Sequence, residues 1–210
     1  PVSIVISEIM YNPASSEGNA ASPEWVEVVN TGAAAVDLGG WLFDDEDSSN
    51  WGAIPANTVL NPNQIAVFFD ATLMSAAQFR TDWAVPAGAL VVGIGWGNLA
   101  NTPSPTNEIL QLFNNIGVEM DVVNFDDASP WPGAADGPSI YLKNLSADNN
   151  NGANWGRSAA GVGGAVSPTG ATFSPSDVGS PGRVFLAGDF NLNGSVDAAD
   201  YVLWRKTLGS

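Results

Sequence analysis

The sequence predicts an all-β fold, and three observations lead to that prediction. Short runs rich in Val, Ile, Phe and Trp recur along the chain, and Gly, Pro and Asn separate them at intervals of roughly ten residues. Only one segment ahead of the C-terminal end has the composition of a helix. With 45% apolar residues and eight Trp, the 210-residue chain can also build a packed core. We therefore expect a β-sandwich rather than alternating strands and helices.

The expected strands begin at the N-terminus. The β-branched run at residues 2–10 is followed by Asn12-Pro13, a turn signal. Residues 24–30, EWVEVVN, place apolar residues among carboxylates in near alternation, and Gly39-Gly40 separates two further short strands. The remaining expected strands are IAVFF (65–69), ALVVGIGW (89–96), EILQLFN (108–114) and VEMDVVNF (118–125).

One helix is expected between these strands, and a loop-rich region follows them. Residues 74–84, MSAAQFRTDWA, combine Ala, Gln and Arg with Phe79 and Trp83 four positions apart. Residues 147–180 have the Asn, Gly, Ser, Thr and Pro content that is typical of a linker. Residues 184–186 are expected to form a last strand before the composition changes.

Charge and composition exclude several classes of function. The net charge of −16 repels phosphate backbones and anionic lipid heads, so we expect no nucleic-acid partner. The sequence has no Cys and no His, which removes disulfides, His-ligated zinc and the Ser-His-Asp and Cys-His nucleophiles. The longest apolar stretch is far shorter than the about 20 residues of a membrane span, so no membrane insertion is expected. The start at Pro1 without Met suggests a processed chain.

The order of the segments resembles the lamin tail domain, an immunoglobulin-like β-sandwich of intermediate-filament proteins and secreted bacterial proteins. The pieces that carry the resemblance are ISEIMYNP, EWVEVVN, VDLGGWLFDD, AAQFRTDW, VVGIGWGNLAN, EILQLFN, DVVNFDDASPWP, DGPSIYL, NWGRS and SPG, across roughly residues 2–183. The resemblance implies an accessory module without catalysis of its own. We expect a sandwich domain at residues 1–183 and a separate C-terminal unit at residues 184–210.

The tryptophans are expected to lie mainly in the core. Aromatic rings of this size bury large areas in sandwiches, and the alternative, a platform that stacks on sugars, needs several aromatics exposed on one face. Trp51 and Trp96 are flanked by Gly and polar residues and are the expected exposed exceptions. The expected core tryptophans are Trp25, Trp41, Trp131 and Trp155.

The C-terminal unit carries a candidate calcium loop. Residues 189–200 read D-F-N-L-N-G-S-V-D-A-A-D, which fits the spacing of a twelve-residue calcium loop with Gly194 at the sharp turn. Val196 is the apolar position that turns inward, and an amphipathic helix is expected to follow. The expected ligands are the side chains of Asp189, Asn191, Asn193, Asp197 and Asp200 and the backbone carbonyl of Ser195.

This loop resembles one repeat of a type I dockerin more than a full EF-hand. No helix former precedes Asp189, and the last ligand is Asp200 rather than Glu, so a weak site of the extracellular, millimolar kind is expected. The alternative is a turn before a helix with Asp197 as N-cap, which needs no metal. Dockerins carry two repeats and bind cohesins. A single repeat favours a structural role. Cohesin docking would instead require a second repeat beyond Ser210.

Two acidic loops are weaker candidates for metal binding. Residues 44–47 and residues 126–127 gather carboxylates next to expected strands, yet exposed acidic loops are usually solvated. Carboxylate pairs are inevitable with 22 acids and do not indicate glycoside hydrolysis. Because the usual acid-base and nucleophile sets are absent, we expect no enzyme.

The leading hypothesis is a secreted, non-catalytic structural or adhesive module with a calcium-stabilised C-terminal appendage. We expect protein partners or self-association into an oligomer or fibre, through strand addition at the apolar run VSIVIS (residues 2–7). The alternatives are an accessory module of a larger secreted hydrolase with a carbohydrate or cell-surface target, and a cohesin-type docking tail. In each case calcium is the expected cofactor and the extracellular space or cell surface the expected location.

Overall fold

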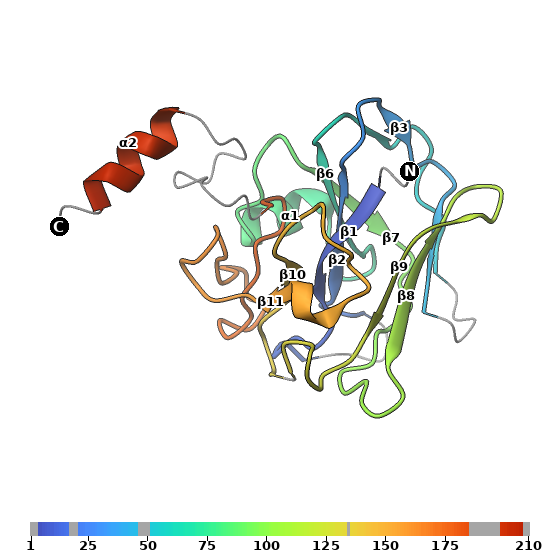
Figure 1. Ribbon diagram of the computed structural model, residues 1–210. Coiled ribbons are helices and arrows are strands. Elements are labelled where there is room, and N and C mark those ends of the chain that lie inside the picture. Colours follow the sequence, from blue (N-terminus) through green and yellow to red (C-terminus); the bar gives the residue numbers. More distant parts are fainter. Residues whose placement is uncertain (1–3, 17–20, 46–50, 134, 185–197, 208–210) are drawn as a thin grey trace.

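The computed structural model describes residues 4–16, 21–45, 51–133, 135–184 and 198–207, and Figure 1 shows their arrangement. The described part is mostly β, with one short helix in the body of the molecule and a second helix near the C-terminus. The strands are β1 (Ile4–Met10), β2 (Trp25–Asn30), β3 (Val36–Asp37), β4 (Leu42–Asp44), β5 (Val59–Leu60), β6 (Ile65–Asp70), β7 (Leu90–Ile94), β8 (Glu108–Phe113), β9 (Glu119–Phe125), β10 (Ile140–Leu142) and β11 (Trp155–Arg157), and the helices are α1 (Ala76–Asp82), the 3-10 helix η1 (Gly152–Asn154) and α2 (Ala198–Thr207).

Two sheets form the sandwich, which confirms the predicted fold class. The larger sheet has six strands in the order β11-β10-β1-β2-β6-β7, and the smaller sheet has three strands in the order β4-β8-β9. Neighbouring strands are antiparallel except for β6 and β7, which run parallel. A two-stranded sheet, β3 with β5, lies beside them. The strand runs identified in the sequence therefore occupy the predicted segments.

The main core lies between the two sheets. The large sheet is buried on both faces. Strand β6 illustrates this, since all six of its residues are buried. Ala66 and Phe68 belong to the core shared with the small sheet, whereas Val67 and Phe69 belong to a second core on the opposite face. A continuous apolar run of this kind is typical of a strand that is covered on both sides.

Helix α1 covers the second face of the large sheet. Its N-cap is Ser75, whose side chain accepts a hydrogen bond from the Gln78 backbone N–H, which satisfies a free donor of the first turn. The Phe79 ring stacks on Phe69 at 4.7 Å, and the Trp83 ring meets Trp25 edge-on at 5.5 Å. The predicted helix is confirmed, and its i, i+4 aromatic pair is what holds it to the sheet.

The loop-rich region after β10 packs on the sandwich and is not a linker. Phe173 lies 5.3 Å from the Trp83 ring, so this region completes the second core. Isolated bridges join Pro138 to Val178 and Val166 to Gly179. Val184, expected in a last strand, is not in a strand, and residues 185–186 lie outside the described residues.

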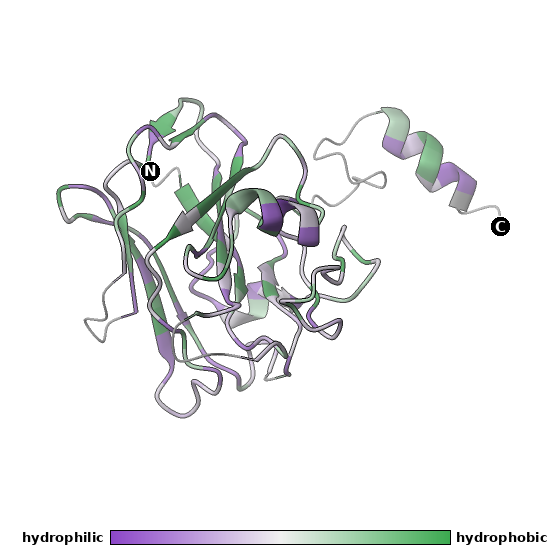
Figure 2. Cartoon of the chain, turned by 180° about the vertical axis from the view of Figure 1, so that it is seen from behind, coloured by the Kyte–Doolittle hydropathy of each residue, from purple (hydrophilic) through white to green (hydrophobic). Residues whose placement is uncertain are grey.

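Helix α2 lies apart from the sandwich in both Figure 1 and Figure 2. Tyr201, Val202, Leu203 and Trp204 are exposed on it, and the rings of Tyr201 and Trp204 lie 5.8 Å apart. Figure 2 shows hydrophobic and hydrophilic residues along its length. Among the described residues, no helix combines the length and hydropathy that crossing a membrane requires.

Two expectations from the sequence are wrong. Trp51 is buried in the main core, because its ring packs against Phe43 at 5.8 Å and Trp96 at 4.6 Å. Trp96 is half-buried, and its indole N–H donates to a carboxylate oxygen of Glu24 over 2.8 Å. The Gly and polar neighbours of these tryptophans therefore do not place them on the surface.

The second wrong expectation is strand addition at VSIVIS. Residues 4–7 of this run belong to β1, an interior strand that lies between β2 and β10. The pairing with β10 covers only Glu8 and Ile9, but the backbone of Ile6 is also occupied, since Asp121 and Asn149 bind its N–H and carbonyl. At Ile6, therefore, this run has no free backbone group on the β10 side for another chain to pair with.

Candidate functional site

The predicted calcium loop falls almost wholly outside the described residues. Its expected ligands at positions 189, 191, 193, 195 and 197 belong to residues that the structure does not describe, and only Asp200 is described. Asp200 lies in the first turn of α2 and is buried. A carboxylate in that turn is favoured by the helix dipole whether or not a metal is bound.

The acidic loops have local structural roles where they are described. The Asp126 side chain accepts a hydrogen bond from the Ala128 N–H, and the Asp127 side chain accepts one from the Ser104 N–H. Asp44 likewise accepts from the Asp45 N–H. Within the described ranges, no group of three or more Asp or Glu residues is arranged to hold a metal ion. Residues 46–47 lie outside those ranges.

A pair of buried carboxylates is the most developed polar arrangement in the sandwich. Glu8 on β1 and Glu27 on β2 are directly opposite partners across the antiparallel pair, and each side chain is only 1% exposed. The register of β1 shifts between Ile6 and Glu8. Ile6 and Ile9 both belong to the main core. A bulge of this kind re-aims side chains. Here it lets both Ile6 and Ile9, which flank the carboxylate in the sequence, belong to the apolar main core.

Serine residues from three separate segments bind Glu8. The Ser139 hydroxyl donates to one carboxylate oxygen over 2.5 Å, and the Ser158 hydroxyl donates to the same oxygen over 3.3 Å. Ser180 donates twice, from its backbone N–H over 2.8 Å and from its hydroxyl over 2.6 Å. Burial raises the pKa of Glu8, and these four hydrogen bonds oppose that rise.

Glu27 is held by two donors. The Ser7 hydroxyl donates to one oxygen over 2.7 Å, and the Gly182 backbone N–H donates to the other over 2.7 Å. Burial, together with the nearby Glu8 carboxylate, raises the pKa of Glu27 well above its ordinary value. Arg183 lies close enough to lower it, but its guanidinium is itself hydrogen-bonded to the Ala84 carbonyl.

The two carboxylates fasten the end of the sandwich to its first strands. Both carboxyls are enclosed. They are neighbours, as in a general acid-base pair, but a substrate has no access to them. Their donors include Ser180 and Gly182, which lie more than 150 residues away in the sequence. Sequence reasoning missed this pair. The only signal was a Glu within each of two apolar runs, IVISEIM and WVEVVN.

Asp121 on β9 is a half-buried carboxylate that joins the two sheets. It accepts the Ile6 N–H over 2.6 Å and the Asn149 side-chain amide over 2.7 Å. Burial raises the pKa of Asp121 to about 6, even though both hydrogen bonds oppose the rise. The bond to Ile6 occupies a backbone N–H of β1 at a position where β10 does not pair with it.

Strand β7 is the edge at the opposite end of the six-stranded sheet, and no described strand pairs with its outer side. Four of its five residues are half-buried, and none is charged. Residues 83–107, which include β7, form the longest run in the sequence without Asp, Glu, Lys or Arg. The other edge strands longer than two residues each carry a charge, namely Arg157 in β11, Asp44 in β4, and Glu119 and Asp121 in β9.

The comparison with known families agrees with this architecture. No curated protein matches the chain. The family described as Lamin Tail Domain matches residues 1–127, which is the part from β1 to β9. Strands β10 and β11 lie beyond the match and complete the six-stranded sheet. The match covers more than half of the sequence and no part of the C-terminal loop, so the chain belongs to the lamin tail domain family.

Proposed function

We propose that this lamin tail domain is a non-catalytic structural module that associates with further copies of itself through the free edge of β7. The observation that carries the proposal is an uncharged, apolar edge strand in a chain whose net charge is −16. Edge strands expose unpaired backbone groups, and proteins usually protect them with charges, prolines or short length. The interior of β7 has none of these devices.

Electrostatics favours β7 over the other edges as the contact between copies. Two chains that each carry −16 repel each other most where carboxylates face carboxylates, and the repulsion is least at a surface without charge. Leu90 and Val92 pack partly on the main core and Val91 on the second core, so the strand is held in an extended form ready for pairing. An antiparallel pair of β7 strands would continue the six-stranded sheet into a second copy.

The C-terminal unit is proposed as a calcium-stabilised appendage of dockerin-like character. Its support is the ligand spacing at Asp189, Asn191, Asn193, Ser195, Asp197 and Asp200, followed by a helix whose first described residue is Ala198. A site with so few charged ligands would fill only where calcium is abundant. This property favours an extracellular or cell-surface location for the protein.

A non-catalytic role is supported by the side chains available. The sequence has no His and no Cys. The buried carboxylate pair, Glu8 with Glu27, is enclosed, and its oxygens accept hydrogen bonds from the chain itself. These carboxylates contribute to the fold rather than to a reaction.

Hydrogen–deuterium exchange tests the proposed edge directly. We expect the backbone amides of residues 90–94 to become more protected as the protein concentration rises in the presence of calcium. The amides of the edge strand β11 (Trp155–Arg157) serve as the internal control, and their exchange should not change with concentration. Exchange at β7 that is independent of concentration would contradict the proposal.

A further inference from the structure

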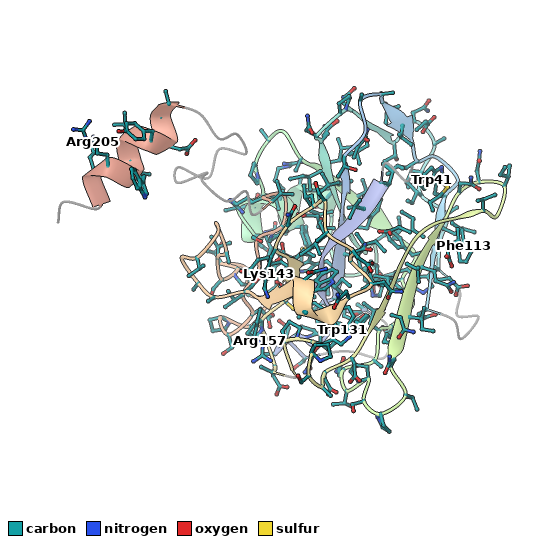
Figure 3. The ribbon with its side chains drawn as sticks, in the orientation of Figure 1. Trp41, Phe113, Trp131, Lys143, Arg157 and Arg205 are labelled. Atoms are coloured by element: carbon teal, nitrogen blue, oxygen red, sulfur yellow. The ribbon has the colours of Figure 1, made fainter. Side chains whose placement is uncertain are left out.

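A pocket beside β8, β9 and η1 is lined by asparagines around one tryptophan. Its volume is about 360 Å³, within the range of about 300 to 1,000 Å³ in which proteins hold small ligands. Asn107 and Asn124 line it from the start of β8 and the end of β9. Asn150 and Asn151 line it from the loop ahead of η1, and Pro130 and Trp131 line it from the loop after β9. Figure 3 shows Trp131 beside the segment that carries η1.

The asparagines are positioned by bonds to one another and to the backbone. The Asn107 amide nitrogen donates to the Asn124 side-chain oxygen over 2.8 Å, and the Asn124 backbone N–H donates to the Asn150 side-chain oxygen over 2.8 Å. The Asn151 side chain caps η1 by accepting from the Ala153 N–H. Among the described residues, the side-chain nitrogens of Asn124 and Asn150 have no hydrogen-bond partner, so donors remain available at the pocket wall.

The tryptophan is fixed by packing against other residues. The Trp131 ring lies 5.8 Å from Trp155 and 6.4 Å from Phe125, and the side chain is half-buried. Gly152 lies against the indole so closely that a Cβ there would come within 2.7 Å of the Trp131 Cγ. A rigid aromatic wall of this kind costs little conformational entropy when a ligand binds, because it is already ordered.

We infer that this pocket binds a neutral saccharide. The lining has no Asp, Glu, Lys or Arg, although the chain as a whole is strongly acidic, so it offers no ion pair to a charged ligand. Amide side chains supply both donors and acceptors, and sugar hydroxyls require both. Trp131 and Pro130 add an apolar wall, and the C–H face of a pyranose ring is the part of a sugar that packs on such a surface.

The inference does not rest on self-association. The pocket lies at β8, β9 and η1, whereas the edge proposed for pairing is β7, at the far end of the six-stranded sheet. A copy joined through β7 therefore leaves the pocket open. A saccharide bound there would attach the module to a glycan surface while β7 pairs with a neighbour.

Calorimetric titration of the full chain with cellohexaose, chitohexaose and mannohexaose tests the site. At least one of these neutral hexasaccharides should bind one-to-one with a dissociation constant below about 1 mM. Asn150→Ala, an exposed residue of the wall, should weaken binding tenfold or more, and so should Trp131→Ala. Asn115→Ala and Trp204→Ala change exposed residues elsewhere and should leave the affinity within twofold of the unaltered chain.

Gly152→Ala gives a second measure that does not remove a hydrogen-bonding group. The added methyl pushes on the indole and narrows the pocket, so binding should fall while the circular dichroism spectrum stays that of the folded chain. The inference is overturned if none of the three sugars binds saturably, or if Asn150→Ala and Gly152→Ala, both folded, bind as tightly as the unaltered chain. Equal or tighter binding of the anionic hexagalacturonate would also overturn it, because the lining offers no cation.

Discussion

Glu8 and Glu27 face each other across β1 and β2, and both carboxyls are buried and accept hydrogen bonds from Ser180 and Gly182, far along the chain. This relationship makes stability depend on pH. Burial raises the pKa of each carboxyl above its ordinary value of 4.5, so the folded chain holds protons that the unfolded chain releases. The stabilisation is complete below pH 4.5 and is lost as the pH rises through the folded-state pKa values.

The free energy of unfolding should therefore be larger at pH 5 than at pH 8. Asp121 acts in the same direction, because its pKa rises from 3.8 to about 6 on folding and its contribution is lost across that interval. Urea unfolding at the two pH values measures the difference. Glu27→Gln, which keeps the size and one oxygen acceptor, should reduce the slope, and an unchanged slope in this variant would show that the pair does not cause it.

Asp121→Ala should destabilise the folded chain by about 1 to 3 kcal/mol at pH 7, because the Ile6 N–H and the Asn149 amide both lose their acceptor. Asp126→Ala is the matched control, since that carboxylate accepts only the Ala128 N–H in an exposed turn. Chemical denaturation should show a loss for the control below about 1 kcal/mol. Equal losses in the two variants would mean that Asp121 does not join the sheets as described.

Gly179→Ala should destabilise the chain by about 1 to 3 kcal/mol, because the new methyl would lie 2.5 Å from the Trp25 indole in the second core. Gly88→Ala is the control, since a Cβ at that position meets no atom within 4 Å. Thermal unfolding followed by circular dichroism distinguishes them. A neutral Gly179→Ala would indicate that the segment from residue 147 onward is a loose linker after all.

Calcium removal should loosen the C-terminal unit. With EDTA, we expect a lower melting temperature and a change in the fluorescence of Trp204, which is exposed on α2. Asp189→Ala removes the first expected ligand and should abolish both responses, and Trp204→Phe should remove the fluorescence change alone. Identical melting curves with and without EDTA would leave the turn with Asp197 as N-cap as the better explanation.

The strands and helix α1 could be predicted from the sequence because they depend on local patterns. IAVFF is apolar throughout and is covered on both faces, and Phe79 with Trp83 marks the buried side of a helix. The positions of Trp51 and Trp96 could not be read this way. Their burial depends on Phe43 and Glu24, which lie on other strands and loops, whereas their sequence neighbours are typical of a surface turn.

The carboxylate pair could not be predicted for the same reason. A Glu in an alternating strand ordinarily indicates the solvent face, and that interpretation fails for Glu8 and Glu27 because Ser180 and Gly182 return to cover them. The pocket around Trp131 likewise depends on the meeting of β8, β9 and η1. Only the calcium spacing at residues 189–200 is readable residue by residue, since its expected ligands all lie within twelve consecutive residues.

Sedimentation velocity of the full chain with calcium tests the central claim, that β7 joins copies of the module. The unaltered chain should sediment increasingly as dimers or larger species as its concentration rises. Val92→Lys puts a charge on the edge strand and should remain monomeric, while Val59→Lys, at an exposed position on β5, should associate like the unaltered chain. A monomer at every concentration, or association that Val92→Lys leaves intact in a folded chain, would contradict the account.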